Sequence, residues 1–239
     1  MKEKIKYELK KQSCHFRYFL WTNILINLLS LMFFSLVSYF EKNGEDSIIT
    51  SSIGIISLAS TLTVSIAIIY GVVIWNRLLL RHYIGNAREI IYLFPGGRGE
   101  IFISKIIALS LLSFINLVSV LFSENLIFYF VGKFLGFMSL NSFSDILKIT
   151  YMSIFVGIFS LTIILISILI GQVFQSTNIS IIASIIIVSI MSNMIAFSYK
   201  FNSVIILTLI IGIFFLNYFL KNILINRVKN DDVIENISA

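Results

Sequence analysis

The sequence predicts an all-α, polytopic membrane protein with six transmembrane helices, an N-terminal amphipathic interfacial helix and a short cytoplasmic helix. Hydrophobic residues make up 58% of the 239 residues and charged residues only 13%, whereas a soluble domain is about half apolar and a quarter charged. The mean hydropathy is +0.96. The apolar runs are continuous, which excludes the alternating pattern of a membrane β-barrel. The length suits one transmembrane domain over residues 1–239.

The spans are identified as runs of about 20 mostly apolar residues, the length of a helix that crosses a bilayer. Six runs qualify: 18–40, 50–75, 102–122, 149–171, 178–199 and 203–220. The first run is longer than the apolar region of a signal peptide and no cleavage pattern follows it, so we expect it to persist as a span. Residues 1–17 are expected to form a cytoplasmic amphipathic segment, and residues 221–239 a cytoplasmic tail, around a six-span core over 18–220.

Two segments depart from a simple helix-and-loop pattern. The charge-free run 47–76 is longer than one bilayer crossing, so the second span is expected to tilt or to extend past the membrane. The connection 123–148 is rich in aromatic residues, which favour the headgroup region over water. We interpret it as an interfacial helix, a re-entrant helix or a continuation of the third span.

Lysine and arginine predict the orientation through the positive-inside rule. Six of them lie in the N-terminal segment, five in the loop between the second and third spans and three in the tail, against four on the opposite side. Both termini are therefore expected in the cytoplasm. The cations flank apolar spans, so the net charge of +6 indicates anionic lipids as partners and no nucleic acid.

Charged residues are expected to be absent from the spans. Lys105 opens the third span and is counted with the preceding loop; the remaining residues of the six runs include no Asp, Glu, Lys, Arg or His. Such charges usually mark proton relays and ion paths. Their absence argues against a proton-coupled transporter.

Catalytic and metal-binding patterns are also missing from the spans, so we expect no catalytic residue and no metal site. Cys14 and His15 are neighbours, but adjacent residues on a helix point about 100° apart and do not form a catalytic dyad. A membrane peptidase is therefore the least favoured class. The chain has no P-loop, because PGGRGE lacks the lysine. Energy for uphill transport would come from another polypeptide.

Mildly polar residues recur at helical spacing in four spans. They fit a weakly polar translocation path for an amphipathic cargo or plain helix packing, and both interpretations stay open. The strongest candidates are Asn23, Asn27, Ser57, Thr61, Ser65 and Asn193. Further residues of this kind are Ser30, Ser153, Gly157, Ser160, Ser189 and Ser192.

The loop 81–105 has the clearest helix-start, helix-stop and turn signals in the chain. Asn86 and Glu89 approximate a capping box that begins a helix at Ala87. Pro95 ends that helix, and Pro95-Gly96 suits a type II turn before the third span begins. The helix would have one apolar face and one face with charges. On spacing alone it is either an ordinary surface helix or a helix that docks in a partner's groove.

The residues of this loop resemble those of the ABC-2 type transporter permease family, in which the corresponding loop carries a coupling helix that sits in a cleft of the ATP-hydrolysing subunit. The pattern is Arg-Glu, a tyrosine, Phe-Pro, Gly-Gly-Arg and a lysine that opens a span. The resemblance implies that the ATPase-coupling residues are Arg88, Glu89, Tyr92, Pro95, Gly96, Gly97, Arg98 and Lys105. The six-span layout with both ends inside resembles the family over nearly the whole chain, and residues 1–17 are similar to its amphipathic connecting helix.

Within that family, the chain resembles the small permeases of lantibiotic and bacteriocin immunity transporters and of antimicrobial-peptide exporters. The resemblance implies a permease subunit in the bacterial cell membrane, a second permease that is identical or homologous, and a cytoplasmic ATPase that binds ATP and Mg. This chain would bind no cofactor itself. The connection 199–202 is minimal, unlike the external region of larger lipid and sterol exporters. The alternative is a non-transporting membrane sensor or assembly factor that recruits a cytoplasmic partner.

Overall fold

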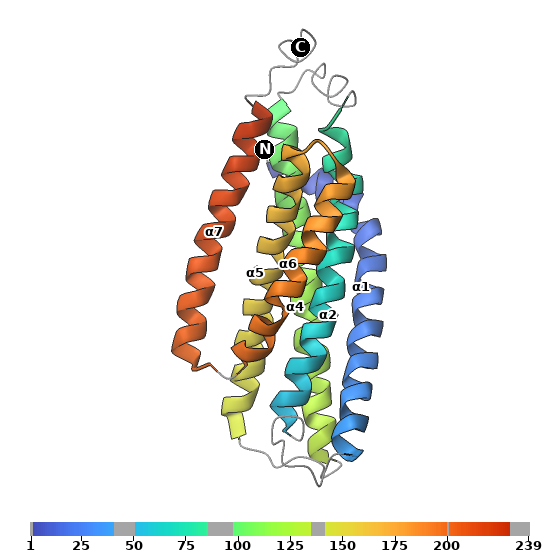
Figure 1. Ribbon diagram of the computed structural model, residues 1–239, viewed down its shortest axis with the longest axis vertical. Coiled ribbons are helices and arrows are strands. Elements are labelled where there is room, and N and C mark those ends of the chain that lie inside the picture. Colours follow the sequence, from blue (N-terminus) through green and yellow to red (C-terminus); the bar gives the residue numbers. More distant parts are fainter. Residues whose placement is uncertain (1, 41–50, 86–97, 135–141, 200, 230–239) are drawn as a thin grey trace.

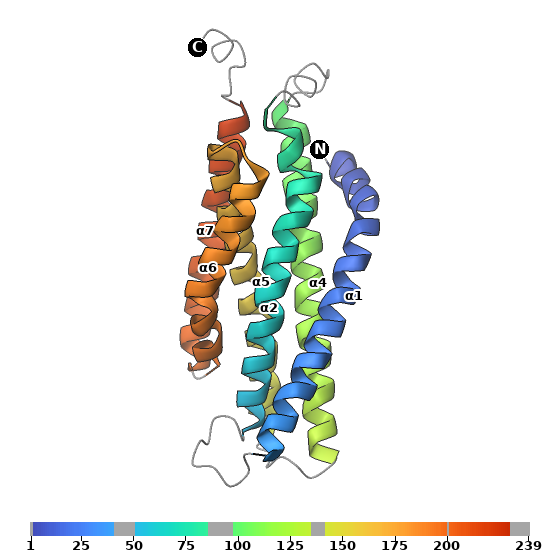
Figure 2. The same cartoon turned by 45° about the vertical axis from the view of Figure 1, so that its right-hand side comes forward.

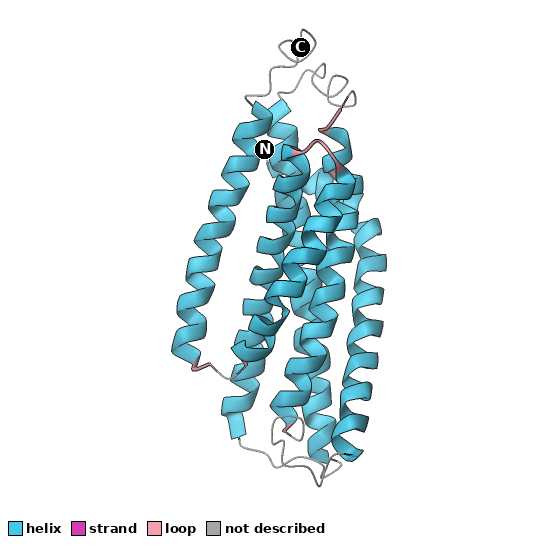
Figure 3. Ribbon diagram, viewed as in Figure 1, coloured by secondary structure: helices cyan, strands magenta, loops and turns pink. Residues whose placement is uncertain are grey.

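The computed structural model describes residues 2–40, 51–85, 98–134, 142–199 and 201–229. Apart from short turns, these ranges are helical, and they include no strand (Figure 3). The elements are α1 (Lys2–Phe40), α2 (Ser52–Leu78), the 3-10 helix η1 (Leu80–His82), α4 (Arg98–Phe134), α5 (Ser142–Val173), α6 (Thr177–Ser198) and α7 (Ser203–Lys229). Six of these helices are long and apolar enough to cross a membrane. The prediction of an all-α protein with six spans is confirmed.

The six long helices run alternately up and down one bundle (Figure 1). Lys2, Lys229, the start of α4 and the α5–α6 turn lie at one end, which we call the proximal end; the end at which α1 and α4 finish is the distal end. An even number of crossings brings both ends of the chain to the same side. The layout therefore agrees with the even span count read from the sequence.

The N-terminal segment is part of α1 and not a separate helix. α1 is continuous from Lys2 to Phe40, and its first turns cross behind the other helices before it descends beside α2 and α4 (Figures 1 and 2). In this first part Glu8, Gln12 and Phe16 are buried, whereas the lysines are exposed. The side of the segment that faces the protein thus includes the polar Glu8 and Gln12 beside the apolar Phe16.

The third span continues well past residue 122. α4 has 37 residues, which is about 55 Å at 1.5 Å per residue and longer than the hydrocarbon core of about 30 Å. Of the three interpretations of 123–148, the described residues show continuation of the span to Phe134, and α5 already begins at Ser142. Likewise α7 runs on to Lys229, so the first residues of the expected tail are helical. A span boundary predicted from hydropathy falls at the first charged residue. The helix itself continues past such a residue, because its backbone hydrogen bonds do not depend on the side chain.

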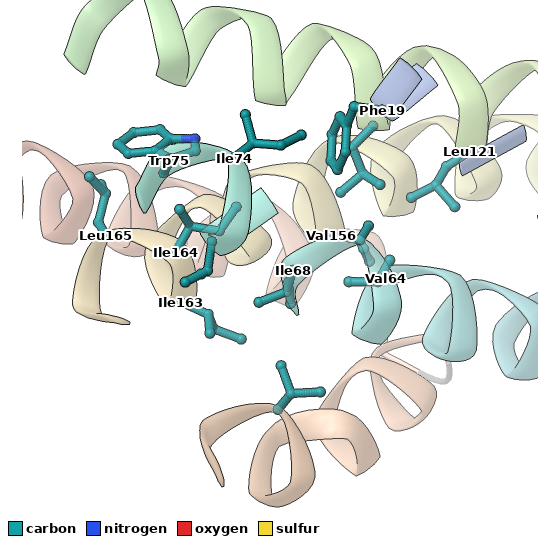
Figure 4. Packing of buried hydrophobic residues seen from close by; sticks show 14 of the residues in the cluster. Phe19, Val64, Ile68, Ile74, Trp75, Leu121, Val156, Ile163, Ile164 and Leu165 are labelled. Atoms are coloured by element: carbon teal, nitrogen blue, oxygen red, sulfur yellow. The ribbon is translucent and has the colours of Figure 1, made fainter. Parts of the chain in front are cut away.

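The core lies among α2, α4 and α5. α1 packs on α2 and α4, α6 on α2 and α5, and α7 on α5 and α4. Trp75 and Val64 of α2, Phe19 of α1 and Val156 of α5 are among the buried side chains at the centre (Figure 4). α7 keeps most of its apolar residues exposed; Phe214, for example, is 63% exposed. An exposed apolar surface of this extent suits a lipid environment.

Candidate functional site

A seam of buried polar side chains runs between α1, α2 and α4. Its members, here called the polar seam, are Asn23, Asn27, Ser60, Thr63, Asn116, Glu124 and Asn125, each at most 7% exposed. Polar groups inside a membrane protein act as contacts between helices or as functional sites, because hydrocarbon offers them no hydrogen bonds. The seam is therefore the first candidate site.

Hydrogen bonds divide the seam into layers. Asn116 donates from Nδ2 to the main-chain oxygen of Phe16 at 3.0 Å and accepts at Oδ1 from Asn23 at 3.5 Å. Nearer the distal end, Thr63 donates to Asn27 Oδ1 at 3.0 Å. The first layer joins α1 to α4 and the second joins α1 to α2. Both layers use bonds between helices, which hold α1 in a defined register against its neighbours.

The third layer lies where α6 ends. Asn125 Nδ2 donates to Ser60 Oγ at 3.2 Å, and the hydroxyl of Tyr199, the residue that follows α6, donates to the same oxygen at 3.1 Å. Ser60 therefore receives hydrogen bonds from α4 and from the α6–α7 connection. Glu124 precedes Asn125 and is buried beside Asn27. The distal layers thus include a carboxyl group.

Asn116 is expected to be important for the packing of α1. Asn116→Leu keeps the approximate volume but removes both bonds of the first layer and leaves the Phe16 carbonyl with only its bond within the helix. We expect it to lower the free energy of unfolding by about 1–2 kcal/mol, measured by SDS titration with circular dichroism. Ser119→Ala on the exposed side of the same helix is the control, because its hydroxyl bonds only to the Asn116 carbonyl of its own helix. Equal losses in both variants would contradict this role.

A second candidate site lies at the proximal end, where both flanks of the loop segment 86–97 are held. On the first flank, the ring of Tyr83 contacts Phe102 of α4 with centroids 4.7 Å apart. Gly85 has a φ of 56°, in the left-handed region that glycine tolerates, and its N–H donates to Gln175 Oε1 in the α5–α6 turn at 3.3 Å. This flank is therefore connected to α4 and to the α5–α6 turn.

The α5–α6 turn fits closely against this flank. A Cβ on Gly171 would lie 2.7 Å from Leu80 Cδ2 and 2.6 Å from Ser180 Cβ, so glycine is required for the approach. Asn76 near the end of α2 donates to the Thr177 carbonyl at 3.1 Å and accepts from Ser180 Oγ at 2.8 Å. These contacts connect the end of α2, η1 and the start of α6.

The second flank is held by the two ends of the chain. In the first turn of α4, Glu100 forms a 2.7 Å ion pair with Lys4 of α1. The side chain of Lys229 lies against Gly99, where a Cβ would be 2.9 Å from its Cε. The start of α4 therefore contacts α1 and the end of α7. The first flank of 86–97 thus contacts α4 and the α5–α6 turn, and the second flank contacts α1 and α7.

The expected coupling residues fall mostly outside the described residues. These are Arg88, Glu89, Tyr92, Pro95, Gly96 and Gly97, and the helix expected over 87–94 lies outside with them. Arg98 opens α4. Lys105 lies one to two turns further along α4, half-buried, with its ammonium 5.9 Å from the centre of the Tyr83 ring. Lys105 is thus positioned beside the first flank of the loop.

The candidate polar residues of the spans divide between core and surface. Asn23 and Asn27 lie in the polar seam. On α2, Ser57 is buried and Thr61 and Ser65 are half-buried, and all three hydroxyls bond to carbonyls of their own helix. Asn193 is exposed on α6. The α6 residues that face the bundle are instead Ser180, Ser184, Val188, Ile195 and Ser198.

The polar-seam residues of α2 and α4 were not among the residues expected from the sequence. Ser60 and Thr63 were overlooked because serine and threonine are frequent along α2. Asn116 and Glu124 are eight residues apart and so share one face of α4; this spacing was the available signal. It went unused because the span was ended at residue 122. The expectation of spans without charged residues is wrong, since the helix from Gly99 to Gly132 includes the buried Glu124.

The fold and these contacts define a multi-pass, six-helix membrane protein with a buried polar seam between α1, α2 and α4 and, at the proximal end, close contacts on both sides of residues 86–97. Compared with models of known protein families, with curated proteins and with solved structures, the chain matches none.

Proposed function

We propose that this chain is the permease subunit of an ATP-driven ABC exporter in a bacterial cell membrane. The two flanks of the loop 86–97 carry the proposal. A loop that receives force from a partner must be connected stiffly to the membrane helices, and here its flanks contact α1, α4, α7 and the α5–α6 turn. A loop that only joins two spans would not need contacts of this kind.

In this proposal the partner is a cytoplasmic ABC ATPase that binds ATP and Mg, and a second permease completes the transporter. Arg88, Glu89 and Tyr92 contact the ATPase, and Pro95 to Arg98 carry its movement into α4. The contact of Gly85 with Gln175 carries it also to the start of α6. The exposed apolar helices contact lipid and the second permease. The cargo is an amphipathic antimicrobial peptide or a similar amphiphile that is expelled from the membrane.

The test uses the chain co-expressed with candidate ABC ATPases from the same genome. Arg88→Ala combined with Glu89→Ala is expected to abolish cargo-stimulated ATP hydrolysis, while the chain still enters the membrane with a normal helix content. The control is Lys6→Ala, which removes an exposed cation at the same end. It is expected to leave coupled hydrolysis within about twofold, since isolated surface charges contribute little.

Two outcomes would contradict the proposal. Coupled hydrolysis that is unchanged in the double variant would remove the coupling assignment. Capture of a cytoplasmic partner that has no ATPase activity, through the same loop, would favour the non-transporting sensor or assembly factor instead.

A further inference from the structure

Glu124 is a buried carboxyl group in a chain whose other described acidic residues are placed near the ends of helices. Only 7% of its surface is exposed. It lies 19 residues beyond Lys105 on α4, about 28 Å along the helix axis. Its neighbour Asn125 is in the layer that Tyr199 joins at the end of α6. Glu124 is therefore inside the bundle but towards its distal end.

The surroundings of Glu124 do not suit an ionised carboxylate. Within the described part of the chain, neither Oε1 nor Oε2 receives a hydrogen bond, although both are inaccessible to solvent. Asn27 is beside the carboxyl group, and its Nδ2, which has no other partner among the described residues, is the group placed to donate to it. A buried carboxylate with one neutral amide beside it and no counter-ion among the described residues has a large desolvation cost, which protonation removes.

Among the side chains that the structure describes, no charged group acts on this carboxylate. The titratable residues on the elements around it are Tyr39 and those between Lys2 and Tyr18 on α1, Tyr70 and Arg77 on α2, Arg98, Glu100, Lys105, Tyr129 and Lys133 on α4, Asp145, Lys148 and Tyr151 on α5, Tyr199 after α6, and Tyr218, Lys221, Arg227 and Lys229 on α7. Of the polar groups described, Asn27 alone acts on the carboxyl group. The basic residues of α1 are all at the opposite end, between Lys2 and Arg17.

We propose that Glu124 is a proton-binding site between α1, α2 and α4. In the bundle as described it carries a proton. When it ionises, the proton passes from the carboxyl oxygen to water at the distal end and leaves a carboxylate. The carboxylate then requires water or a cation at its oxygens, because nothing else among the described residues neutralises it. This inference is independent of the proposed function, because it concerns the chain alone.

Infrared spectroscopy of the purified chain in lipid nanodiscs tests the proposal. The wild-type chain is expected to show the carbonyl band of a protonated carboxyl group at about pH 7, where exposed carboxyl groups, with pKa values of about 4, are ionised. Glu124→Gln, which resembles the protonated side chain in shape, is expected to lose the band. Glu3→Gln, at an exposed position of α1, is the control and is expected to retain it.

Each possible result of the infrared experiment either supports or overturns the assignment of the proton to Glu124. The proposal is overturned if the wild-type chain has no such band at neutral pH, or if Glu124→Gln keeps it. It is also overturned if sodium chloride, but not choline chloride, removes the band, because the site would then bind a metal cation. Should Glu124→Gln fail to fold, Glu124→Asp replaces it: a shifted band supports the assignment to this residue, and an unshifted band contradicts it.

Discussion

Replacing Trp75 by alanine is expected to destabilise the bundle more than most other single truncations. Trp75 of α2 has no exposed surface and is in the central cluster (Figure 4), and its Nε1 donates to Ser113 Oγ of α4 at 3.0 Å. The truncation leaves a cavity between α2 and α4 and removes that bond. Deletion of a large buried side chain typically costs about 3–5 kcal/mol, since the surroundings collapse only partly into the space.

The chain has two tryptophans, so Trp21 is the matched control. Trp21 is 60% exposed on α1, and its truncation is expected to change the free energy of unfolding by less than about 1 kcal/mol. The measurement is SDS titration of each variant, followed by circular dichroism. Trp75→Phe separates the two contributions, because it keeps much of the volume and loses only the bond. Equal stabilities of Trp75→Ala and Trp21→Ala would contradict the assignment of the core to α2, α4 and α5.

Gly157→Leu is expected to separate α5 from α4. A Cβ at Gly157 would overlap Val118 Cγ2 and lie 3.2 Å from the ring of Phe114. The β-branched Val118 has few alternative rotamers, so the contact is relieved mainly by movement of the helices. Overpacking of this kind costs up to about 3 kcal/mol. We expect a corresponding loss of stability in SDS titration, and aggregation of the variant at elevated temperature.

Gly212 on α7 is the matched control, because nothing lies within 4 Å of a Cβ built there. Gly212→Leu is expected to be neutral or slightly stabilising, since leucine has the better helix propensity by several tenths of a kcal/mol. A compensation experiment identifies the cause: Val118→Ala should recover part of the stability lost in Gly157→Ala. If Val118→Ala adds its own loss to that of Gly157→Ala instead, steric contact with α4 is not the reason.

Hydropathy was sufficient for the number and order of the spans, because each helix must satisfy its backbone groups internally and present apolar side chains to lipid. Both requirements act within one segment, so a single sequence displays them. The same signal placed the ends of α4 and α7 too early, since helical hydrogen bonding continues through Glu124 and Lys221. It also could not separate the buried Asn27 from the exposed Asn193, because in lipid both faces of a helix are apolar.

The sequence by itself thus determined the membrane class and the six long helices; of the segment 81–105, residues 86–97 lie outside the described residues and α4 already begins at Arg98. The tertiary structure alone decided that Asn23 pairs with Asn116, Thr63 with Asn27 and Asn125 with Ser60, and that Glu124 is buried beside Asn27. It alone connected Gly85 to Gln175 and Lys4 to Glu100. The physical reason is distance along the chain. These contacts join residues from 36 to 96 positions apart, and in hydrocarbon such pairings depend on how the helices pack together.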